Sequence, residues 1–240
     1  AFLGLWASSF CYFAALGFVL PFLPLLLQMS SLTYAEIGII YMIGLVFPVV
    51  LQTLWGALAD RIGRRTIIIL ATIVASIISG LYPYASSFIQ FLLLGLLWNA
   101  FLAVATTVTP ALAMDIAGTV TVGKRFGRYR ISGSIGWITS TATSGLIAES
   151  VGIKTIFYLA AILYLLSAIF VRISVRDQPA IKNETGRNRN LRQLIRNKNF
   201  VILLSTIFMA NISATTFLSF LSLYMSNLGG SDTIIGWAFS

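Results

Sequence analysis

Long apolar runs separated by short polar turns follow one another along most of the chain, and the first 35 residues carry no charged side chain. A helix needs about 20 mostly apolar residues to cross the hydrocarbon core of a bilayer. Seven runs meet this requirement: Phe2–Gln28, Ala35–Leu58, Thr66–Tyr84, Phe88–Met114, Phe126–Glu149, Lys154–Val171 and Phe200–Asn227. The pattern predicts an all-α polytopic membrane protein.

The seventh run restarts the first. With an ungapped offset of 198 residues, Leu20, Phe22, Leu23 and Leu25 match Leu218, Phe220, Leu221 and Leu223, and Ile37-Gly38 matches Ile235-Gly236. An eighth run, Thr233–Ser240, stops too soon to cross a bilayer. We therefore expect a truncated chain: a six-helix bundle over residues 1–171, a polar central loop over 172–199, and the start of a second bundle over 200–240.

The basic residues predict the orientation. The turn after the second span holds three of the 16 Lys and Arg residues, the turn after the fourth span with the start of the fifth holds four, and the central loop holds eight. If the spans alternate in direction, these fifteen lie on one side, and only Lys154 lies on the other. The positive-inside rule then places the N-terminus and the central loop in the cytoplasm, and the chain in the cytoplasmic (plasma) membrane.

The central loop has a helical pattern of its own. Leu191, Leu194 and Ile195 recur at helical spacing, with Arg192 and Arg196 between them. This arrangement predicts a short amphipathic helix on the anionic inner leaflet. A solvated linker is the alternative.

Composition excludes several classes of protein. Apolar types make up 58% of the chain and charged types 10%, whereas soluble domains are usually about 25% charged. The net charge of +9 therefore records topology, and we expect no nucleic-acid partner. The chain has no His, which is the usual catalytic base and the commonest metal ligand, and its single Cys11 excludes an internal disulfide. We expect neither an enzyme nor a metal site.

The turn after the second span carries an unusual set of residues, Gly56-Ala57-Leu58-Ala59-Asp60-Arg61-Ile62-Gly63-Arg64-Arg65. Gly56 permits close approach of another helix, and Gly63 permits a tight turn. Asp60 lies near a helix C-terminus, where the dipole disfavours a carboxylate, so it needs a partner. A basic topology anchor would account for the arginines, but not for Asp60 or the glycines.

This turn resembles the signature loop of the major facilitator superfamily, G-x-L-A-D-R-x-G-R-R, at every one of those positions. The resemblance implies the major facilitator fold, with two six-helix bundles. It also implies a charge network that latches one conformation. Asp115, at the end of the fourth span, resembles the third, acidic member of that network. The implied latch residues are Gly56, Asp60, Arg61, Gly63, Arg64, Arg65 and Asp115.

A second resemblance points to a branch of the superfamily. Phe126–Trp137 is similar to the fifth span of lactose permease-type sugar:proton symporters and of phenylpropionate-permease-like members, and Pro21–Pro24 resembles the end of their first span. By motif position, Arg130 would bind sugar hydroxyls and Trp137 would stack on the sugar ring. The carboxylate that pairs with the arginine in the sugar symporters is replaced by Leu112. Asp115 is a second candidate for that role.

Helical geometry supports the same site. Residues 130, 134 and 137 are spaced i, i+4 and i+7, so Arg130, Ser134 and Trp137 share one helix face. At 1.5 Å per residue, Trp137 lies about 10 Å deeper than Arg130. A snorkelling anchor is the alternative for Arg130, and helix packing is the alternative for Trp137. Asn99, Tyr12 and Phe18 are further candidates for the lining of a substrate path, and Asn99 could instead tie two helices together.

These observations predict a secondary transporter that moves a small organic solute, sugar-like or an aromatic or carboxylate compound, by alternating access. We expect proton symport with the proton gradient as the energy source and no cofactor. A drug:proton antiporter is the alternative, although its Gly-Pro and Gly-Gly signature is missing from Ser140–Gly145. A receptor or scaffold that does not transport is the alternative from another class. The expected partners are the substrate, the bilayer and the missing half of the chain, in a monomer.

Overall fold

The computed structural model describes residues 2–117, 122–175 and 198–240. Every regular element in these ranges is helical, as the apolar runs predicted. The elements are α1 (Phe2–Met29), α2 (Tyr34–Ile62), α3 (Arg64–Leu81), the short 3₁₀ helix η1 (Tyr82–Tyr84), α4 (Phe88–Ala117), α5 (Val122–Val151), α6 (Ile153–Ser174), α8 (Lys198–Asn227) and α9 (Asp232–Ala238). The amphipathic helix predicted around Leu191–Arg196 falls outside the described residues.

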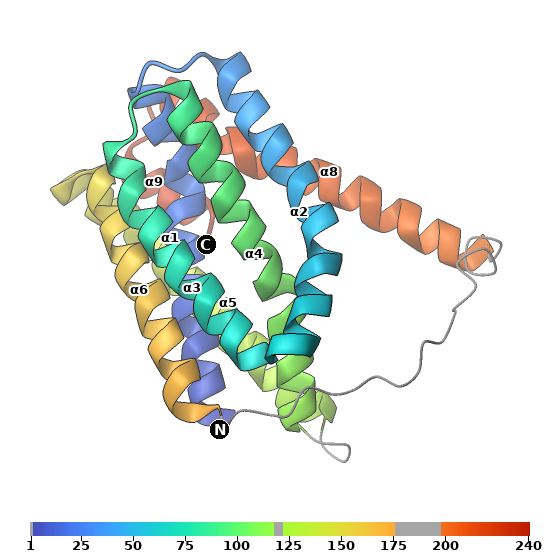
Figure 1. The fold of residues 1–240 in the computed structure, drawn as a ribbon. Helices are drawn as coiled ribbons and strands as arrows, with labels where there is room; N and C mark the ends of the chain where they lie inside the picture. The colour runs from blue at the N-terminus through green and yellow to red at the C-terminus, as the bar shows by residue number, and fades with distance from the viewer. Residues whose placement is uncertain (1, 118–121, 176–197) are drawn as a thin grey trace.

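The first six helices form a bundle with α1 in its interior (Figure 1). Helix α1 packs along α5 on one side and along α6 on the other, while α3 packs on α6 and α2 packs on α4. The start of α1, the turn between α2 and α3 and the last turn of α6 lie at one end of this bundle. We call it the basic end, because Arg61, Arg64, Arg65 and Arg172 lie there.

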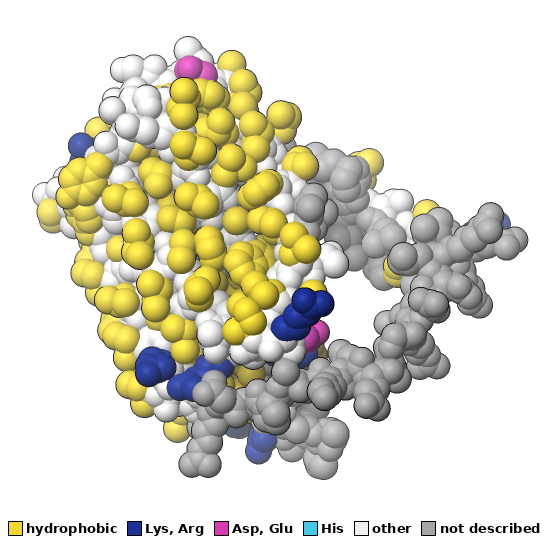
Figure 2. Space-filling model, viewed as in Figure 1, with side chains coloured by type: hydrophobic (Ala, Val, Ile, Leu, Met, Phe, Trp, Pro, Cys, Tyr) yellow, Lys and Arg dark blue, Asp and Glu magenta, His cyan; other side chains and the backbone are white. Residues whose placement is uncertain are grey.

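The outside of the bundle is apolar. Figure 2 shows a face covered with hydrophobic side chains, with Lys and Arg gathered at its lower edge. By length and composition, four described helices are able to cross a membrane, namely α1, α3 with η1, α4 and α6, and α2 would be a fifth if its two bent segments count as one span. Helix α5 is not among them, because serine, threonine and glycine replace much of its apolar surface.

Several helices run beyond the apolar segments predicted from the sequence. Helix α2 continues to Ile62 and α4 to Ala117, so Asp60 and Asp115 are helical residues. Hydropathy marks the length of the hydrocarbon layer, whereas backbone hydrogen bonds propagate past it into the polar layer at little cost. The chain between α2 and α3 is reduced to Gly63, whose φ of 103° is a conformation that glycine adopts without strain.

Helices α8 and α9 repeat α1 and α2 in register. Helix α1 ends at Met29 and α8 at Asn227, and the helix N-caps that follow are Thr33 and Ser231; both pairs are 198 residues apart. The two caps act alike, because each side-chain oxygen accepts a hydrogen bond from the backbone N–H three residues on. The offset found in the sequence therefore corresponds to a structural repeat.

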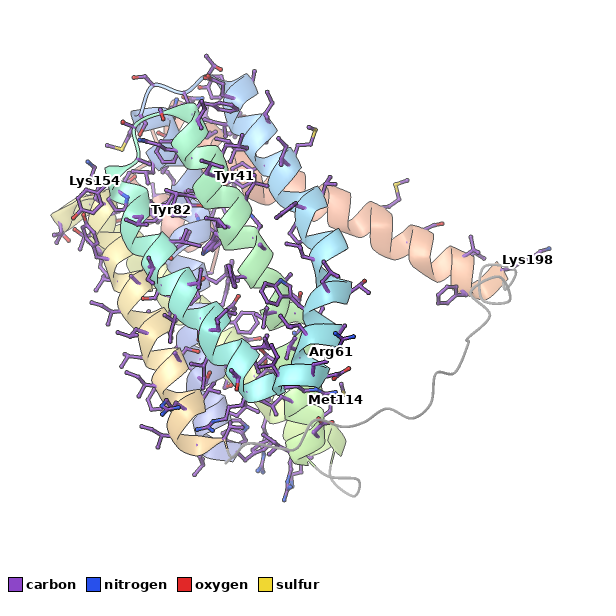
Figure 3. The ribbon with its side chains drawn as sticks, viewed as in Figure 1. Tyr41, Arg61, Tyr82, Met114, Lys154 and Lys198 are labelled. Atoms are coloured by element: carbon purple, nitrogen blue, oxygen red, sulfur yellow. The ribbon has the colours of Figure 1, made fainter. Side chains whose placement is uncertain are left out.

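The contacts of the described side chains of the repeated helices lie between the middle of the bundle and the end opposite the basic end. Leu223, Ile235 and Phe239 are buried in the same hydrophobic core as the first helices. Helix α8 then leans away, and its first residue, Lys198, lies far from the bundle (Figure 3). The two parts of the chain are therefore joined at the end opposite the basic end and separate toward the basic end.

Candidate functional site

The predicted face of α5 borders a hollow of about 340 Å³. Its lining residues come from α1 and α5 and are Phe13, Leu16, Arg130, Ser134, Trp137 and Ile138. The side chains of Arg130 and Ser134 are exposed in the hollow, and that of Trp137 is half-buried. The helical spacing thus brought Arg130, Ser134 and Trp137 to one wall, as predicted. Their role in binding stays a prediction.

Small residues let α5 and α1 lie almost backbone to backbone. A Cβ added to Gly136 would stand 2.3 Å from the carbonyl oxygen of Phe10, and one added to Gly17 would stand 2.2 Å from Oγ of Ser140. Neither position has room for a side chain. This close contact, typical of small residues in membrane helices, holds the two walls of the hollow in a set position.

Trp137 also contacts the second part of the chain. Its indole Nε1 donates a hydrogen bond of 3.0 Å to the carbonyl oxygen of Phe239, directly after α9. One residue therefore lines the hollow and joins α5 to the start of the repeat. The sequence offered ring stacking and helix packing as alternatives for Trp137, and this bond adds a third role that only the position of α9 reveals.

Chemically, the hollow is an apolar and aromatic surface with one cation and one hydroxyl. A guanidinium offers a planar set of donors to a carboxylate or to hydroxyl groups, and Ser134 adds a donor and acceptor one turn away. Aromatic and aliphatic walls suit a flat or apolar body. Among the described residues, no group of three His, Cys, Asp or Glu side chains could hold a metal ion.

The other three predicted lining residues lie elsewhere. Asn99 donates to the carbonyl oxygen of Gly95 on its own helix at 2.9 Å, and its amide lies against Gly44, where an added Cβ would meet it at 2.8 Å. It therefore belongs to the packing of α4 on α2. Phe18 is buried in the hydrophobic core. Neither side chain lines the hollow, and Asn99 matches the alternative that it ties two helices together; a role for either residue in a substrate path stays a prediction.

Tyr12 faces the interior of the bundle instead of the hollow. Its ring packs edge-on against Tyr164 with 5.3 Å between the centroids. It lines a small internal cavity of about 20 Å³ together with hydroxyl-bearing residues such as Ser8, Ser9 and Thr72. This volume suits a single water molecule and no organic substrate.

Three lining residues were missed by the sequence analysis. Phe13 and Leu16 are one helix turn apart on α1, and Ile138 follows Trp137 on α5. In the sequence these three residues differ in no way from the many other apolar residues that follow helical spacing within apolar runs. Contact with the small-residue face of α5 is what distinguishes them.

The predicted latch residues meet at the basic end. Nη2 of Arg64 lies 3.4 Å from Oδ1 of Asp60, and Nη1 of Arg64 is ion-paired with Oδ2 of Asp115. Arg64 thus joins the end of α2, the start of α3 and the end of α4. The partner that Asp60 was expected to need is Arg64. Of the two roles open to Asp115, the geometry matches the charge network.

The other predicted latch residues do not join the ion pairs between Arg64 and the two carboxylates. Arg61 is exposed, and both ion pairs found among the described residues involve Arg64 instead. Arg65 points to α6, where it donates to the carbonyl oxygen of Arg172 at 2.6 Å. An added Cβ on Gly56 would meet nothing within 4 Å, so close packing at this glycine stays a prediction. Gly63 makes the tight turn as predicted.

Polar contacts join the two parts of the chain at the opposite end. The amide Nδ2 of Asn227 on α8 donates to the hydroxyl of Tyr34 on α2 at 3.0 Å, and Nε2 of Gln28 donates to the same oxygen at 3.2 Å. On α9, the hydroxyl of Thr233 donates to the carboxylate of Glu149 on α5. Burial and the nearby Glu149 carboxylate raise the pKa of Asp232.

Two glycines form the centre of this junction. A Cβ on Gly145 of α5 would stand 2.3 Å from the carbonyl oxygen of Asp232, and one on Gly236 of α9 would stand 2.7 Å from the carbonyl oxygen of Thr141. Helices α5 and α9 therefore cross in direct backbone contact. Any side chain at either position would push the two parts of the chain apart.

Known proteins share both the sequence pattern and the fold. Residues 3–240 match the model of the MFS_1 like family. Multidrug resistance protein MdtG is 27% identical over 234 residues in Rahnella sp. (strain Y9602) and 28% identical over 242 residues in Escherichia coli (strain K12 / DH10B). Each alignment covers 94% of this chain and 57% of the relative, so the chain spans little more than half the length of these relatives.

A solved structure of the nucleoside transporter NupG has the same fold. It aligns with a TM-score of 0.77 at 19% identity, over 91% of this chain and 56% of that chain. The family model covers nearly all of the residues described here and includes the signature turn at Gly56–Arg65. The chain therefore belongs to the MFS_1-like family of the major facilitator superfamily, whose members are membrane transporters and not enzymes.

Proposed function

We propose that this chain supplies the first six-helix bundle, and the first helices of the second, of a secondary transporter for a small amphipathic organic solute. The observation that carries the proposal is the hollow between α1 and α5, where one guanidinium faces an aromatic and aliphatic wall beside the start of the second bundle. The basic end faces the cytoplasm in this proposal, because basic residues accumulate on that side of membrane proteins.

The contacts between the two bundles support transport by alternating access. They are joined through α5 and α9 and through Tyr34 and Asn227, and they separate toward the basic end. This arrangement fits a state open to the cytoplasm. A complementary state would break the junction and bring the basic ends together, so the substrate would reach the hollow from either side in turn.

The direction of transport has two candidates. The resemblance of Phe126–Trp137 to the fifth span of sugar:proton symporters favours proton-coupled uptake. The relatives named multidrug resistance proteins favour drug export by proton antiport instead. Arg130 favours an acidic or hydroxylated compound under either direction, because its charge repels a cation.

A transport assay on the full-length protein tests the proposal. Proteoliposomes with an imposed proton gradient are screened against aromatic carboxylates, sugars and known drugs. Accumulation of the compound together with inward proton flow supports symport. Expulsion of the compound in exchange for inward proton flow supports antiport. Binding of a compound with no flux and no counterflow would instead support a receptor or scaffold and would contradict the transporter.

Substitution of Trp137 separates the role of the ring from that of its nitrogen. Trp137→Phe keeps an aromatic surface and loses the bond to Phe239, whereas Trp137→Leu loses both. An aromatic contact contributes about 0.5–1.5 kcal/mol, so we expect the affinity of the transported compound to be roughly two- to tenfold higher in the Phe variant than in the Leu variant. Equal loss in both would show that Trp137 acts only by joining the bundles.

The latch is tested by removing one carboxylate at a time. Partly exposed ion pairs contribute about 0–1 kcal/mol each, so Asp60→Asn or Asp115→Asn should shift the ratio of the two access states by up to roughly fivefold. Distances between spin labels on the two bundles report this ratio. Lys124→Gln removes an exposed charge from the same end and serves as the control. An unchanged ratio in both Asn variants would contradict a latch.

A further inference from the structure

A second hollow lies on the outer surface of the bundle, between α3 and α6 at the basic end. Its volume is about 490 Å³, and its lining residues are Arg65, Thr66, Ile69, Leu70, Ile73, Val74 and Arg172. It shares no lining residue with the hollow between α1 and α5. Leu70 and Ile73 are 46% and 38% exposed, so this groove opens outward, where a membrane protein meets lipid.

The groove is charged at its mouth and apolar along its length. Arg65 lies in the first turn of α3, and Arg172 lies in the last turn of α6. Helix ends of this kind lie at the level of lipid headgroups when the helices cross a bilayer. Ile69, Leu70 and Ile73 follow in the next turns of α3, toward the hydrocarbon layer.

One hydrogen bond brings the two arginines together. Nη2 of Arg65 donates to the carbonyl oxygen of Arg172 at 2.6 Å, which fixes the start of α3 against the end of α6. The adjacent Arg64 points the other way, toward the carboxylates of Asp60 and Asp115. The two successive arginines of the turn therefore lie on different sides of the bundle. Arg64 contacts the carboxylates of Asp60 and Asp115, and Arg65 lines the outward-facing groove.

We propose that this groove binds an anionic phospholipid, with the headgroup phosphate on Arg65 and Arg172 and an acyl chain along Ile69, Leu70 and Ile73. Arginine donates to phosphate oxygens in a bidentate geometry, and basic pockets between membrane helices suit anionic headgroups. Figure 2 shows the corresponding pattern on the surface, a hydrophobic face with basic side chains at its lower edge. This inference needs only that α3 and α6 span the bilayer.

Lipid retention tests the proposal. The full-length protein is purified in detergent containing equal amounts of phosphatidylglycerol and phosphatidylcholine, and bound lipids are counted by native mass spectrometry. We expect preferential retention of phosphatidylglycerol, falling by roughly fivefold for each of Arg65→Gln and Arg172→Gln. Lys154→Gln removes a positive charge from the opposite end of α6 and should leave retention unchanged. Equal retention in all three variants would overturn the proposal.

A second variant keeps both arginines and fills the groove. Leu70→Trp places a bulky ring where the acyl chain would lie, at a side chain exposed enough to tolerate it. Loss of phosphatidylglycerol in this variant supports a seated lipid, whereas undiminished retention shows diffuse attraction to surface charge and overturns the groove. Competition with millimolar inorganic phosphate distinguishes the sources of the ligand: displacement of the lipid by free phosphate would show a simple anion site and contradict a lipid site.

Discussion

Replacing Gly145 by alanine should hold the two bundles apart at the end opposite the basic end. The new methyl group would stand 2.3 Å from the carbonyl oxygen of Asp232, which is backbone and cannot rotate away. Overpacking of this kind costs about 1–3 kcal/mol, so the population of the state closed at this end should fall by roughly one to two orders of magnitude. Turnover should fall with it, because a transporter has to pass through both states.

Accessibility distinguishes this effect from misfolding. In a Cys11→Ser, Phe13→Cys background, the cysteine lines the hollow and reports access by an impermeant maleimide from the side of the junction. Gly145→Ala should increase labelling from that side. Gly127→Ala, on the same helix, is the matched control, because a Cβ there meets nothing within 4 Å. Unchanged labelling in Gly145→Ala would show that α5 and α9 do not form the closing contact.

Replacing Arg130 by lysine should nearly abolish transport while leaving the protein folded. Lysine keeps the charge but not the planar set of donors, so it cannot bind a carboxylate or a pair of hydroxyls through two parallel bonds. Hydrogen bonds with a charged partner contribute about 1.5–3 kcal/mol, which predicts a loss of roughly 10- to 100-fold in transport efficiency. Proteoliposome flux of the compound found by screening measures this loss.

A neighbouring arginine supplies the control. Arg128 lies on the same helix, but its guanidinium stands over the ring of Trp6 at 5.9 Å from the centroid, away from the hollow. Arg128→Lys keeps the cation over the ring and should transport normally. If Arg130→Lys also transports normally, Arg130 is an anchor at the membrane surface and the substrate binds elsewhere.

The helices and the ion pairs of Arg64 were readable in the sequence because their signals are local. Apolar runs of bilayer length correspond to α1 to α6 and α8. The boundaries shifted where helices continue into the polar layer, and α3 gives way to a 3₁₀ helix at Tyr82. The charged residues between Gly56 and Arg65 follow the order of the signature loop. In the structure, Arg64 forms ion pairs with both Asp60 and Asp115. The 198-residue offset even places the helix caps Thr33 and Ser231.

The lining of the hollow was only partly readable. The spacing of Arg130, Ser134 and Trp137 alone places them on one helix face, so it was predictable that they would line the same wall. Asn99, Tyr12 and Phe18 lie outside the hollow, and the sequence could not show this, because polarity or aromaticity in a membrane helix does not tell whether a side chain faces a path, a neighbouring helix or the core. Phe13 and Leu16 look like any apolar residues until α5 is packed against α1.

The sequence by itself determined the class of protein, the helices, the repeat and the charge network, since each depends on residues close together or on an exact motif. Only the tertiary structure decided which faces of α1 and α5 enclose the hollow, that Trp137 reaches Phe239, and that Gly145 and Gly236 let α5 and α9 touch. The physical reason is that hydrophobicity marks no single face of α1, while small residues cover much of α5. Hydrophobicity places them in the membrane, and the fit of small residues against particular neighbours decides how they pack.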